Sequence, residues 1–292
     1  MNLNEFEELK SLTVSFENKI AHIQLSRPEK LNSMNPDFWR ELPVVIKAID
    51  REAAARVIVI SSCGKHFTAG MDLEVFAKIG ASAGGEPARY RESFRRTVLE
   101  LQEAFNALEN ARMPVLVAIQ GGCIGGGVDL VCAADSRYCT ADAYFIIKET
   151  DLAMTADLGT LQRMPRLMPE GLVRELAYSS RKLKANEALS AGFVNRVFET
   201  QKEMMDGVME IARRIARQSP MAVTGSKEMF NYNRNNGLSE SLRYAATWQA
   251  GLFSLPDIQR AIKAQMEKSD AEYEELRVLD SPLNSDQGST DA

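Results

Sequence analysis

Residues 115–129 of this chain read VLVAIQGGCIGGGVD, and this stretch decides the fold class. Its first five residues form a continuous apolar run, as expected of a strand that is buried on both faces. Five of the seven residues at 121–127 are glycine, and we expect a helix to begin within them. Glycine is costly inside regular structure, so this cluster indicates close approach of the backbone to another group. Tight packing of a helix on a strand is the alternative interpretation.

Strand and helix signals alternate around this stretch. Asn35 followed by Pro36 is a typical helix start, which predicts a helix over 36–50. Apolar residues spaced by four, three, four and three predict a long helix over 88–110, and the small residues at 80–87 predict a loop. Strands are expected at residues 12–16, 20–25, 56–61, 136–140 and 144–148, the first two forming a hairpin. This alternation predicts an α/β fold.

The last third of the chain differs from the rest. From about 200 to 272 the sequence predicts mostly helix, with breaks at Pro220, Asn236-Gly237 and Pro256. We therefore expect three regions: an α/β core over residues 1–200, a helical region over 201–275 and a disordered tail over 276–292.

Composition excludes several classes of function. Lys and Arg total 35 against 40 Asp and Glu, so the net charge is −5 and a nucleic-acid partner is not expected. No run of 18 apolar residues predicts a membrane span. With two histidines and no CxxC spacing among four cysteines, no metal site is expected. No targeting signal is visible, so we expect a cytoplasmic protein, a mitochondrial or peroxisomal location remaining open.

Two further segments carry residues suited to catalysis. Residues 66–72, HFTAGMD, follow the strand expected at 56–61, and a small-residue turn there leaves backbone N–H groups free to bind an oxyanion. Glu149 and Asp157 flank a mostly apolar stretch, and an acid in an apolar cleft has a raised pKa that suits proton transfer. Plain structural roles are the alternatives: Gly70 in a turn, Glu149 paired with a lysine and Asp157 as a helix cap.

Together, the three segments resemble the crotonase family, also called the enoyl-CoA hydratase/isomerase superfamily. The resemblance extends from about residue 12 to 270 and is densest at 27–32, 66–76 and 121–163. It implies a spiral of ββα units with a C-terminal helical trimerisation region. It also implies that the chain binds acyl-CoA thioesters, with two backbone N–H groups holding the thioester oxygen as it becomes an enolate.

The same resemblance assigns roles to particular residues. The oxyanion donors correspond to the backbone N–H groups of Met71 and Gly126. The CoA-binding segments correspond to Lys30, Leu31 and Asn32 and to Ala69, Gly70 and Asp72. No cofactor is implied, since coenzyme A is part of the substrate. The expected assembly is a homotrimer or a homohexamer made of two trimers.

Within the family, the acids decide the reaction. A 2-enoyl-CoA hydratase has glutamates at the positions of Asp129 and Glu149 and usually a small residue at that of Asp157. Acids at all three positions resemble the Δ3,5-Δ2,4-dienoyl-CoA isomerase branch. That reaction converts a 3,5-dienoyl-CoA of unsaturated fatty acid β-oxidation into the 2,4-dienoyl-CoA by moving a proton from C2 to C6. We expect Glu149 to transfer the proton at C2 and Asp157 the proton at C6, while Asp129 orients or balances the pair. The reverse assignment of Glu149 and Asp157 remains open.

The sequence leaves other functions open. A 2-enoyl-CoA hydratase or a Δ3-Δ2-enoyl-CoA isomerase on the same fold is the nearest alternative, although Asp129 and Asp157 argue against the hydratase. A non-catalytic binding member is a third possibility. Its basic helix would be 88–110, but glutamates interrupt the arginines there, which favours a solvated face of mixed charge. His22 is expected to be structural, and His66 matches no acid–base role in the family.

Overall fold

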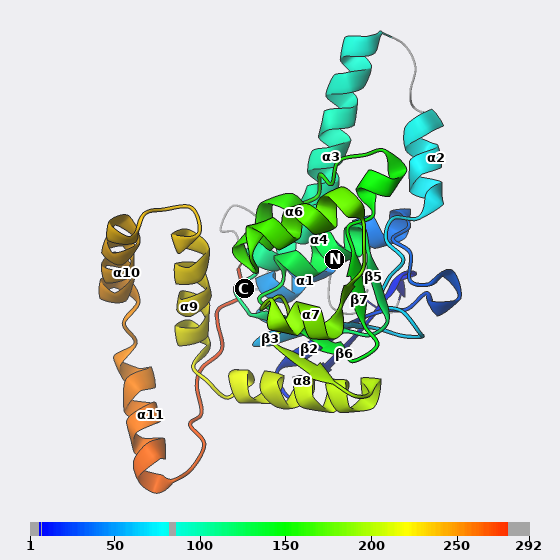
Figure 1. Cartoon of the computed structure of the whole chain (residues 1–292). Coiled ribbons are helices and arrows are strands. Elements are labelled where there is room, and N and C mark those ends of the chain that lie inside the picture. Colours follow the sequence, from blue (N-terminus) through cyan, green and yellow to red (C-terminus); the bar gives the residue numbers. More distant parts are fainter. Residues whose placement is uncertain (1–5, 7, 82–85, 280–292) are drawn as a thin grey trace, which may run out of the picture.

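The computed structural model describes Phe6 and residues 8–81 and 86–279. A six-stranded sheet with the order β1-β2-β3-β4-β6-β9 lies at its centre (Figure 1). β1 and β2 are antiparallel, and the other neighbours are parallel. The strands are β1 (Leu12–Glu17), β2 (Ile20–Leu25), β3 (Val57–Ser62), β4 (Val115–Ile119), β6 (Ser136–Thr140) and β9 (Arg196–Phe198). The predicted α/β fold is confirmed.

A second, three-stranded sheet consists of β5, β7 and β8. Its strands are β5 (Gly122–Ile124), β7 (Tyr144–Ile146) and β8 (Leu183–Lys184). β5 lies inside the glycine cluster, where no strand was expected. It forms by parallel pairing with β7, a segment more than 20 residues away in sequence. β7 ends at Ile146, earlier than the predicted strand at 144–148.

The hairpin between β1 and β2 is confirmed. Asn18 and Lys19 join the strands, with φ angles of 52° and 64°. Positive φ at both central residues is the mark of a type I′ turn, whose twist matches that of the paired strands. The hairpin forms one edge of the large sheet.

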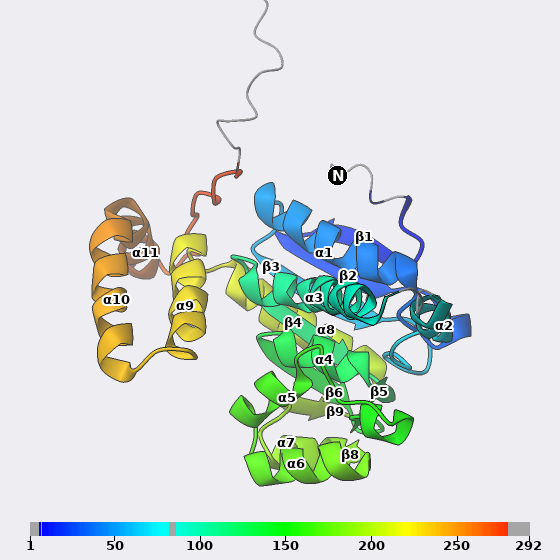
Figure 2. The ribbon, with the colours of Figure 1, turned by 90° about the horizontal axis from the view of Figure 1, so that it is seen from above.

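Helices cover both faces of the large sheet (Figure 2). Val57 and Val59 of β3 belong to a cluster with the apolar side of α8 (Gln201–Ala216). Ile58 and Ile60 belong to the main core, together with buried residues of α1 (Pro36–Arg51), α3 (Pro87–Asn110) and α4 (Gly126–Ala133). Alternate side chains of the strand therefore enter different cores, which explains its continuous apolar sequence.

Two helix predictions can be followed along the chain. The Asn35 side chain accepts a hydrogen bond from the N–H of Phe38 at 3.0 Å and caps α1, as expected. In α3, Phe105 and Leu108 are buried but Phe94 is 40% exposed. The first part of α3 rises out of the body beside α2 (Leu73–Ala81) (Figure 1). The loop predicted at 80–87 is shorter than expected, since α2 reaches Ala81 and α3 begins at Pro87; residues 82–85 lie outside the described part.

Short helices connect several strands. One of them, η2 (Pro28–Lys30), follows β2. Between β7 and β9 lie η3 (Glu149–Leu152), α5 (Thr160–Arg163), η4 (Met164–Arg166), α6 (Glu170–Ser179) and α7 (Ala185–Ser190). Across the described residues, no helix is long and apolar enough to span a membrane.

The C-terminal helices stand apart from the large sheet (Figures 1 and 2). They are α9 (Pro220–Asn233), α10 (Leu238–Leu252) and α11 (Leu255–Glu267), with breaks where the sequence predicted them. The chain then returns to the core, where Glu275 pairs with Arg56 at 2.9 Å and the Leu279 N–H donates to the Arg51 carbonyl at 2.7 Å. The division at 200 and 275 stays a prediction, and most of the expected tail (280–292) lies outside the described residues.

Candidate active site

The three segments selected from the sequence lie side by side. The Ala69 N–H donates to the Leu31 carbonyl at 2.9 Å, and the Met34 N–H donates to the Gly70 carbonyl at 2.8 Å. Thr68 forms a parallel bridge with Cys123 in the glycine cluster. These backbone contacts bring the turn at 66–72 against both the segment after β2 and the start of α4.

Among the described residues, neither the Met71 N–H nor the Gly126 N–H at this junction has a hydrogen-bond acceptor. Met34 bonds to Gly70 and Asp72 on either side of Met71, so the Met71 N–H faces the opposite way. A Cβ atom added to Gly70 would lie 3.6 Å from the Gly126 nitrogen, which places the two donors close together. Such a pair of preorganised donors can hold an oxyanion.

Gly70 is required for this approach. Its φ angle is 87°, a conformation that other residues rarely adopt. A Cβ atom at this position would lie 2.7 Å from the Ile124 carbonyl oxygen. The turn interpretation of Gly70 is therefore confirmed, and the turn conformation allows the two N–H groups to approach each other.

Asp129 and Glu149 lie next to these donors. Asp129, in the first turn of α4, is 1% exposed, and its Oδ1 accepts a hydrogen bond from the Thr160 N–H at 2.6 Å. Glu149 begins η3, and its Oε1 lies 3.4 Å from the position of a Cβ atom added to Gly125. The Glu149 carboxyl is thus beside the residue that precedes the Gly126 donor.

Asp157 completes the group from the turn that leads into α5. The Gln102 side chain of α3 donates to the Asp157 backbone carbonyl at 2.6 Å, which ties this turn to α3. Gly159, not Asp157, is the residue before α5, so the helix-cap interpretation of Asp157 is wrong. The lysine interpretation of Glu149 is also wrong: the neighbouring Lys148 pairs with Asp151 at 2.6 Å, and within the described part of the chain Glu149 forms no ion pair with a lysine.

The acids influence one another electrostatically. Burial raises the pKa of Asp129 to about 7, and the negative charges of Glu149 and Asp157 act in the same direction. Burial also raises the pKa of Glu149, with a further contribution from the charge of Asp157. The pKa of Asp157 is raised by partial desolvation of its carboxyl, although the residue keeps contact with solvent. Three acids with raised pKa values in one place are suited to proton transfer.

The predicted CoA-binding residues divide into two groups. Lys30 and Leu31 are exposed, so their side chains are accessible from solvent. Asn32 is buried and donates to the carbonyls of Cys63 at 2.7 Å and His66 at 3.0 Å, so it shapes the loop.

Asp72 is also engaged within the protein. Its carboxylate accepts hydrogen bonds from the Ser33 hydroxyl at 2.7 Å and the Glu74 N–H at 3.0 Å. These bonds, that from Ser33 first, hold the pKa of Asp72 below its ordinary value. Ala69 and Gly70 take part through their backbones, in the contacts described above.

Both histidines serve the fold. His66 Nδ1 accepts a hydrogen bond from the Gly122 N–H at 2.9 Å and so supports the glycine cluster. His22 contacts the Ser61 hydroxyl at 2.7 Å between β2 and β3, and burial lowers the pKa of its ring.

Gln102 and Thr160 are the residues of this site that the sequence did not reveal. Gln102 follows Leu101 in a helix selected for its apolar stripe, and nothing in that pattern marks its amide. Thr160 acts through its backbone N–H, which any residue except proline supplies. Their positions next to the acids depend on contacts 55 and 31 residues apart in sequence.

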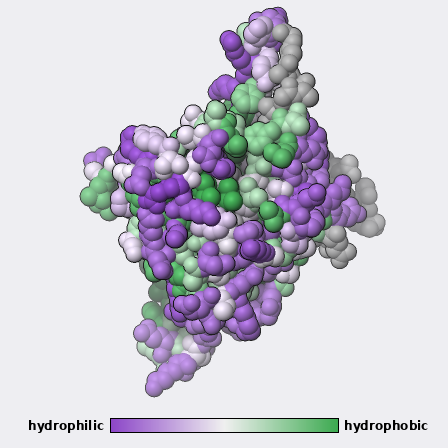
Figure 3. Space-filling model, turned by 45° about the vertical axis from the view of Figure 1, so that its right-hand side comes forward, coloured by the Kyte–Doolittle hydropathy of each residue, from purple (hydrophilic) through white to green (hydrophobic). Residues whose placement is uncertain are grey.

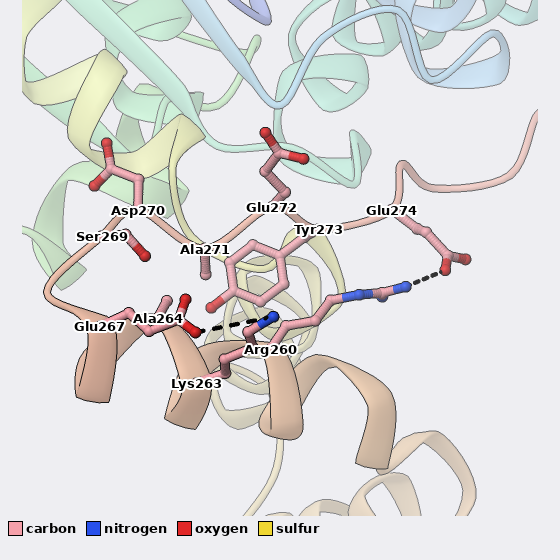
Figure 4. Close-up of a pocket in the computed structure, with 10 residues that line it drawn as sticks. All are labelled: Arg260, Lys263, Ala264, Glu267, Ser269, Asp270, Ala271, Glu272, Tyr273 and Glu274. Atoms are coloured by element: carbon pink, nitrogen blue, oxygen red, sulfur yellow. Dashed lines mark hydrogen bonds and ion pairs between the residues drawn. The ribbon is translucent and has the colours of Figure 1, made fainter.

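Other candidate sites are less suited to chemistry. In the described part of the chain, no three His, Cys, Asp or Glu side chains are grouped to hold a metal ion. A cavity of about 460 Å³ lies between α11 and the segment 269–274 (Figure 4). Four of its charged groups pair with one another: Arg260 with Glu274 at 2.5 Å and Lys263 with Glu267 at 3.9 Å. The acid site is therefore the better candidate.

Curated proteins of similar sequence include several dienoyl-CoA isomerases. The mitochondrial Δ(3,5)-Δ(2,4)-dienoyl-CoA isomerase of Mus musculus is 43% identical over 88% of this chain and 79% of its own length. The peroxisomal enzyme of the same name from Arabidopsis thaliana is 38% identical over 94% of this chain and its full length. A short-chain-enoyl-CoA hydratase of Clostridium acetobutylicum is 29% identical over 89% of this chain.

Solved structures agree with this relationship. An enoyl-CoA hydratase from Bacillus anthracis superposes with a TM-score of 0.82 and is 29% identical, covering 90% of this chain and 99% of its own. A Thermobifida fusca structure in complex with acetoacetyl-CoA has a TM-score of 0.75 at 27% identity and covers 84% of this chain. The family model described as enoyl-CoA hydratase/isomerase matches residues 15–276. The chain therefore belongs to the enoyl-CoA hydratase/isomerase, or crotonase, family, as its three motifs predicted.

Proposed function

We propose that this protein is a Δ3,5-Δ2,4-dienoyl-CoA isomerase. One observation carries the proposal: three mutually interacting acids, Asp129, Glu149 and Asp157, lie beside two backbone N–H groups without acceptors. The names of the relatives from mouse and Arabidopsis support the same reaction. Asp157 matters most, because a second proton-transfer group is what a shift between distant carbons requires.

Substrate binding begins with the thioester. Its carbonyl oxygen accepts hydrogen bonds from the N–H groups of Met71 and Gly126, which stabilise the negative charge that develops there. The exposed Lys30 and Leu31 are proposed to contact the CoA portion, while Asn32, Asp72 and the backbone of Ala69 and Gly70 hold the loops in place. Figure 3 shows apolar surface gathered below the projecting α2 and α3, a suitable environment for an acyl chain.

The proton is moved in two steps. Ionised Glu149 removes a proton from C2, and the electrons delocalise over a dienolate from the thioester oxygen to C6. Protonated Asp157 then donates its proton to C6, which leaves the 2,4-dienoyl-CoA. A proton leaves C2 and another arrives at C6, so the substrate and product have the same composition and no cofactor is needed. The acid pair returns to its starting state when a proton passes from Glu149 to Asp157 or exchanges with solvent.

Asp129 is proposed to keep the pair in balance. It is the most deeply buried of the three, and its pKa of about 7 means that it carries a proton for part of the time at neutral pH. A neutral Asp129 spares Glu149 a second nearby negative charge. One carboxyl oxygen of Asp129 already accepts a hydrogen bond from the Thr160 N–H. Asp129 is therefore less suited to activating water than a carboxylate with both oxygens free.

The proposal is tested with Glu149→Gln and Asp157→Asn. Each change keeps the shape of the side chain and removes its ability to transfer a proton, so we expect turnover of a 3,5-dienoyl-CoA to fall by about 10²–10⁴-fold. The measurement is the rise in ultraviolet absorbance as the diene becomes conjugated with the thioester. CoA binding should persist in both variants.

Asp151→Asn is the matched control. Asp151 belongs to the same short helix as Glu149 but pairs with Lys148 at the surface, and its loss should leave turnover near that of the wild type. Near wild-type turnover in both Glu149→Gln and Asp157→Asn would reject the assignment. Hydration of a 2-enoyl-CoA, seen as a fall in absorbance, would favour the hydratase alternative.

Assembly and location complete the proposal. We propose a homotrimer or a dimer of trimers, with the C-terminal helices at the contacts, and no nucleic-acid partner. A cytoplasmic location stays a prediction from the sequence, while the related enzymes named above are mitochondrial in mouse and peroxisomal in Arabidopsis. Fractionation of cells that express the protein would separate these locations.

A further inference from the structure

We propose that Arg163 is a positioning residue for catalysis, whose guanidinium holds the turn that carries Asp157. The inference rests on the role proposed for Asp157 above. The partners of the Arg163 guanidinium are Glu109, Asn106 and the Leu158 carbonyl, and through them it connects the active site to α3 and α9.

The guanidinium of Arg163 lies directly against the turn. Its Nη1 is 3.4 Å from the carbonyl oxygen of Leu158, the residue that follows Asp157. A Cβ atom added to Gly159 would lie 2.0 Å from the same Nη1. The guanidinium therefore occupies the space that a side chain at 159 would need, and the turn folds around it with a φ of 131° at Gly159.

The other edges of the same guanidinium are fixed by α3. Nε donates to Glu109 Oε2 at 2.9 Å, and Nη2 donates to Asn106 Oδ1 at 2.7 Å. The side chains of Arg163 and Glu109 are 16% and 24% exposed, so solvent competes little for these contacts. Three nitrogens reach three different partners, which only the planar fork of arginine can do.

Glu109 is in turn held by α9. The Arg234 guanidinium at the end of α9 pairs with the second oxygen of Glu109, and the Asn231 amide donates to the Glu109 carbonyl at 2.9 Å. Burial alone would raise the pKa of Glu109, but the charges of Arg163 and Arg234 hold it below its ordinary value. Glu109 therefore stays ionised at neutral pH and keeps its hold on Arg163.

The turn is followed by a helix that depends on tertiary contacts. α5 has four residues, too few for a helix to be stable without tertiary contacts. Gln102 fixes the Asp157 carbonyl on one side, and Arg163 fixes the next two residues on the other. A displacement of about 1 Å in a reacting group can cost about 10²-fold in rate, so the precision of this turn bears directly on turnover.

The first test is Arg163→Met, assayed for kcat and KM with a 3,5-dienoyl-CoA. We expect kcat to fall by about 10- to 100-fold and KM to change by less than about threefold, because the CoA contacts lie elsewhere. Arg174→Met is the matched control: it removes an arginine–glutamate pair on the surface of α6 and should leave kcat unchanged. A kcat within about threefold of the wild type in Arg163→Met would overturn the inference.

A double-mutant cycle with Asp157→Asn separates positioning from general damage. If Arg163 acts through Asp157, Arg163→Met should lower the residual kcat of Asp157→Asn by less than about threefold further. A full second drop in that background would overturn the inference, while leaving the proposed function intact. Wild-type kcat in Asp157→Asn alone would instead overturn the proposed role of Asp157.

Arg163→Lys keeps the inference testable if Arg163→Met does not fold, as judged by circular dichroism and thermal melting. Lysine retains the charge opposite Glu109 but cannot reach Glu109, Asn106 and the Leu158 carbonyl in one plane. The same fall in kcat and the same lack of additivity with Asp157→Asn are expected. A fully active Arg163→Lys would show that charge alone suffices and would overturn the proposed geometry.

Discussion

The carboxyl groups of Asp129, Glu149 and Asp157 differ mainly in their surroundings. Asp129 is 1% exposed, Glu149 is half-buried and Asp157 faces solvent. Neighbouring negative charges make ionisation of all three unfavourable, so their protons are lost in separate steps. This separation lets one acid act as a base while another donates a proton, as the proposed reaction requires.

The roles of Glu149 and Asp157 can be distinguished by isotope exchange. With Glu149 as the base at C2, Asp157→Asn should still exchange the C2 hydrogen of a substrate with deuterium from solvent, while conversion to product is lost. Glu149→Gln should lose both processes, because no dienolate forms. Mass spectrometry or NMR of the recovered thioester measures the exchange. The opposite pattern would reverse the assignment.

Asp129 should make stability depend on pH. Its pKa rises from the ordinary 3.8 to about 7 on folding, so between these values the folded state binds more protons than the unfolded state. Stability therefore falls as the pH rises through this window. Asp129→Asn has no proton to lose, so it should be less sensitive to pH and more stable than the wild type at pH of about 8. Chemical denaturation across this range measures the difference, and parallel curves for both proteins would contradict the prediction.

At the scale of elements, the start of α4 is placed by the turn before α2. The Gly70 turn and the Ile124 carbonyl are in close contact, and Gly126 begins the helix two residues later. The two proposed oxyanion donors come from different elements, so their separation depends on this contact. Under the proposed mechanism, a small shift of either element changes the fit to the thioester oxygen.

Gly70→Ala should disturb this contact. The new Cβ atom would meet the Ile124 carbonyl at 2.7 Å and would strain a φ of 87°, so the donors should move apart. Losing one such donor typically costs about 10²–10³-fold in rate, and we expect kcat to fall by up to that amount. Gly171→Ala is the control, because a Cβ atom on this α6 residue meets nothing within 4 Å. Equal kcat values for the two variants would contradict the prediction.

At the scale of the whole molecule, the C-terminal helices leave much apolar surface uncovered. These helices and the residue after α10 carry exposed apolar side chains that include Phe230 (72%), Leu238 (73%), Leu242 (62%), Phe253 (55%) and Met266 (80%). Surface of this kind is typical of subunit contacts. It is the structural basis for the proposed assembly.

Leu242→Glu should weaken this assembly. A charge at this position in the first half of α10 would be buried at the proposed apolar contact between subunits, where it lacks a partner. We expect the molecular mass in light scattering to fall toward that of a single chain. Arg243→Glu, the neighbouring position on α10, tests whether added charge alone has this effect. An unchanged mass in Leu242→Glu would place the contacts elsewhere.

Local sequence patterns were sufficient for most of the large elements. Signals within a few residues can be recognised without knowledge of the fold. Examples are the apolar run of β4, the Asn35-Pro36 start of α1 and the hairpin of β1 and β2. The sequence did not predict β5, and it did not show that the first part of α3 is exposed. Both properties depend on segments that are distant in sequence.

The candidate site shows the same division. The sequence by itself determined the glycine cluster, the turn at 66–72 and the three acids, because family resemblance and residue chemistry can be recognised in the chain alone. Only the tertiary structure placed the Gln102 amide on Asp157, the Thr160 N–H on Asp129 and the Arg163 guanidinium beneath the turn. These contacts form because whole helices pack against one another and bring the segments together. No local sequence pattern encodes that packing.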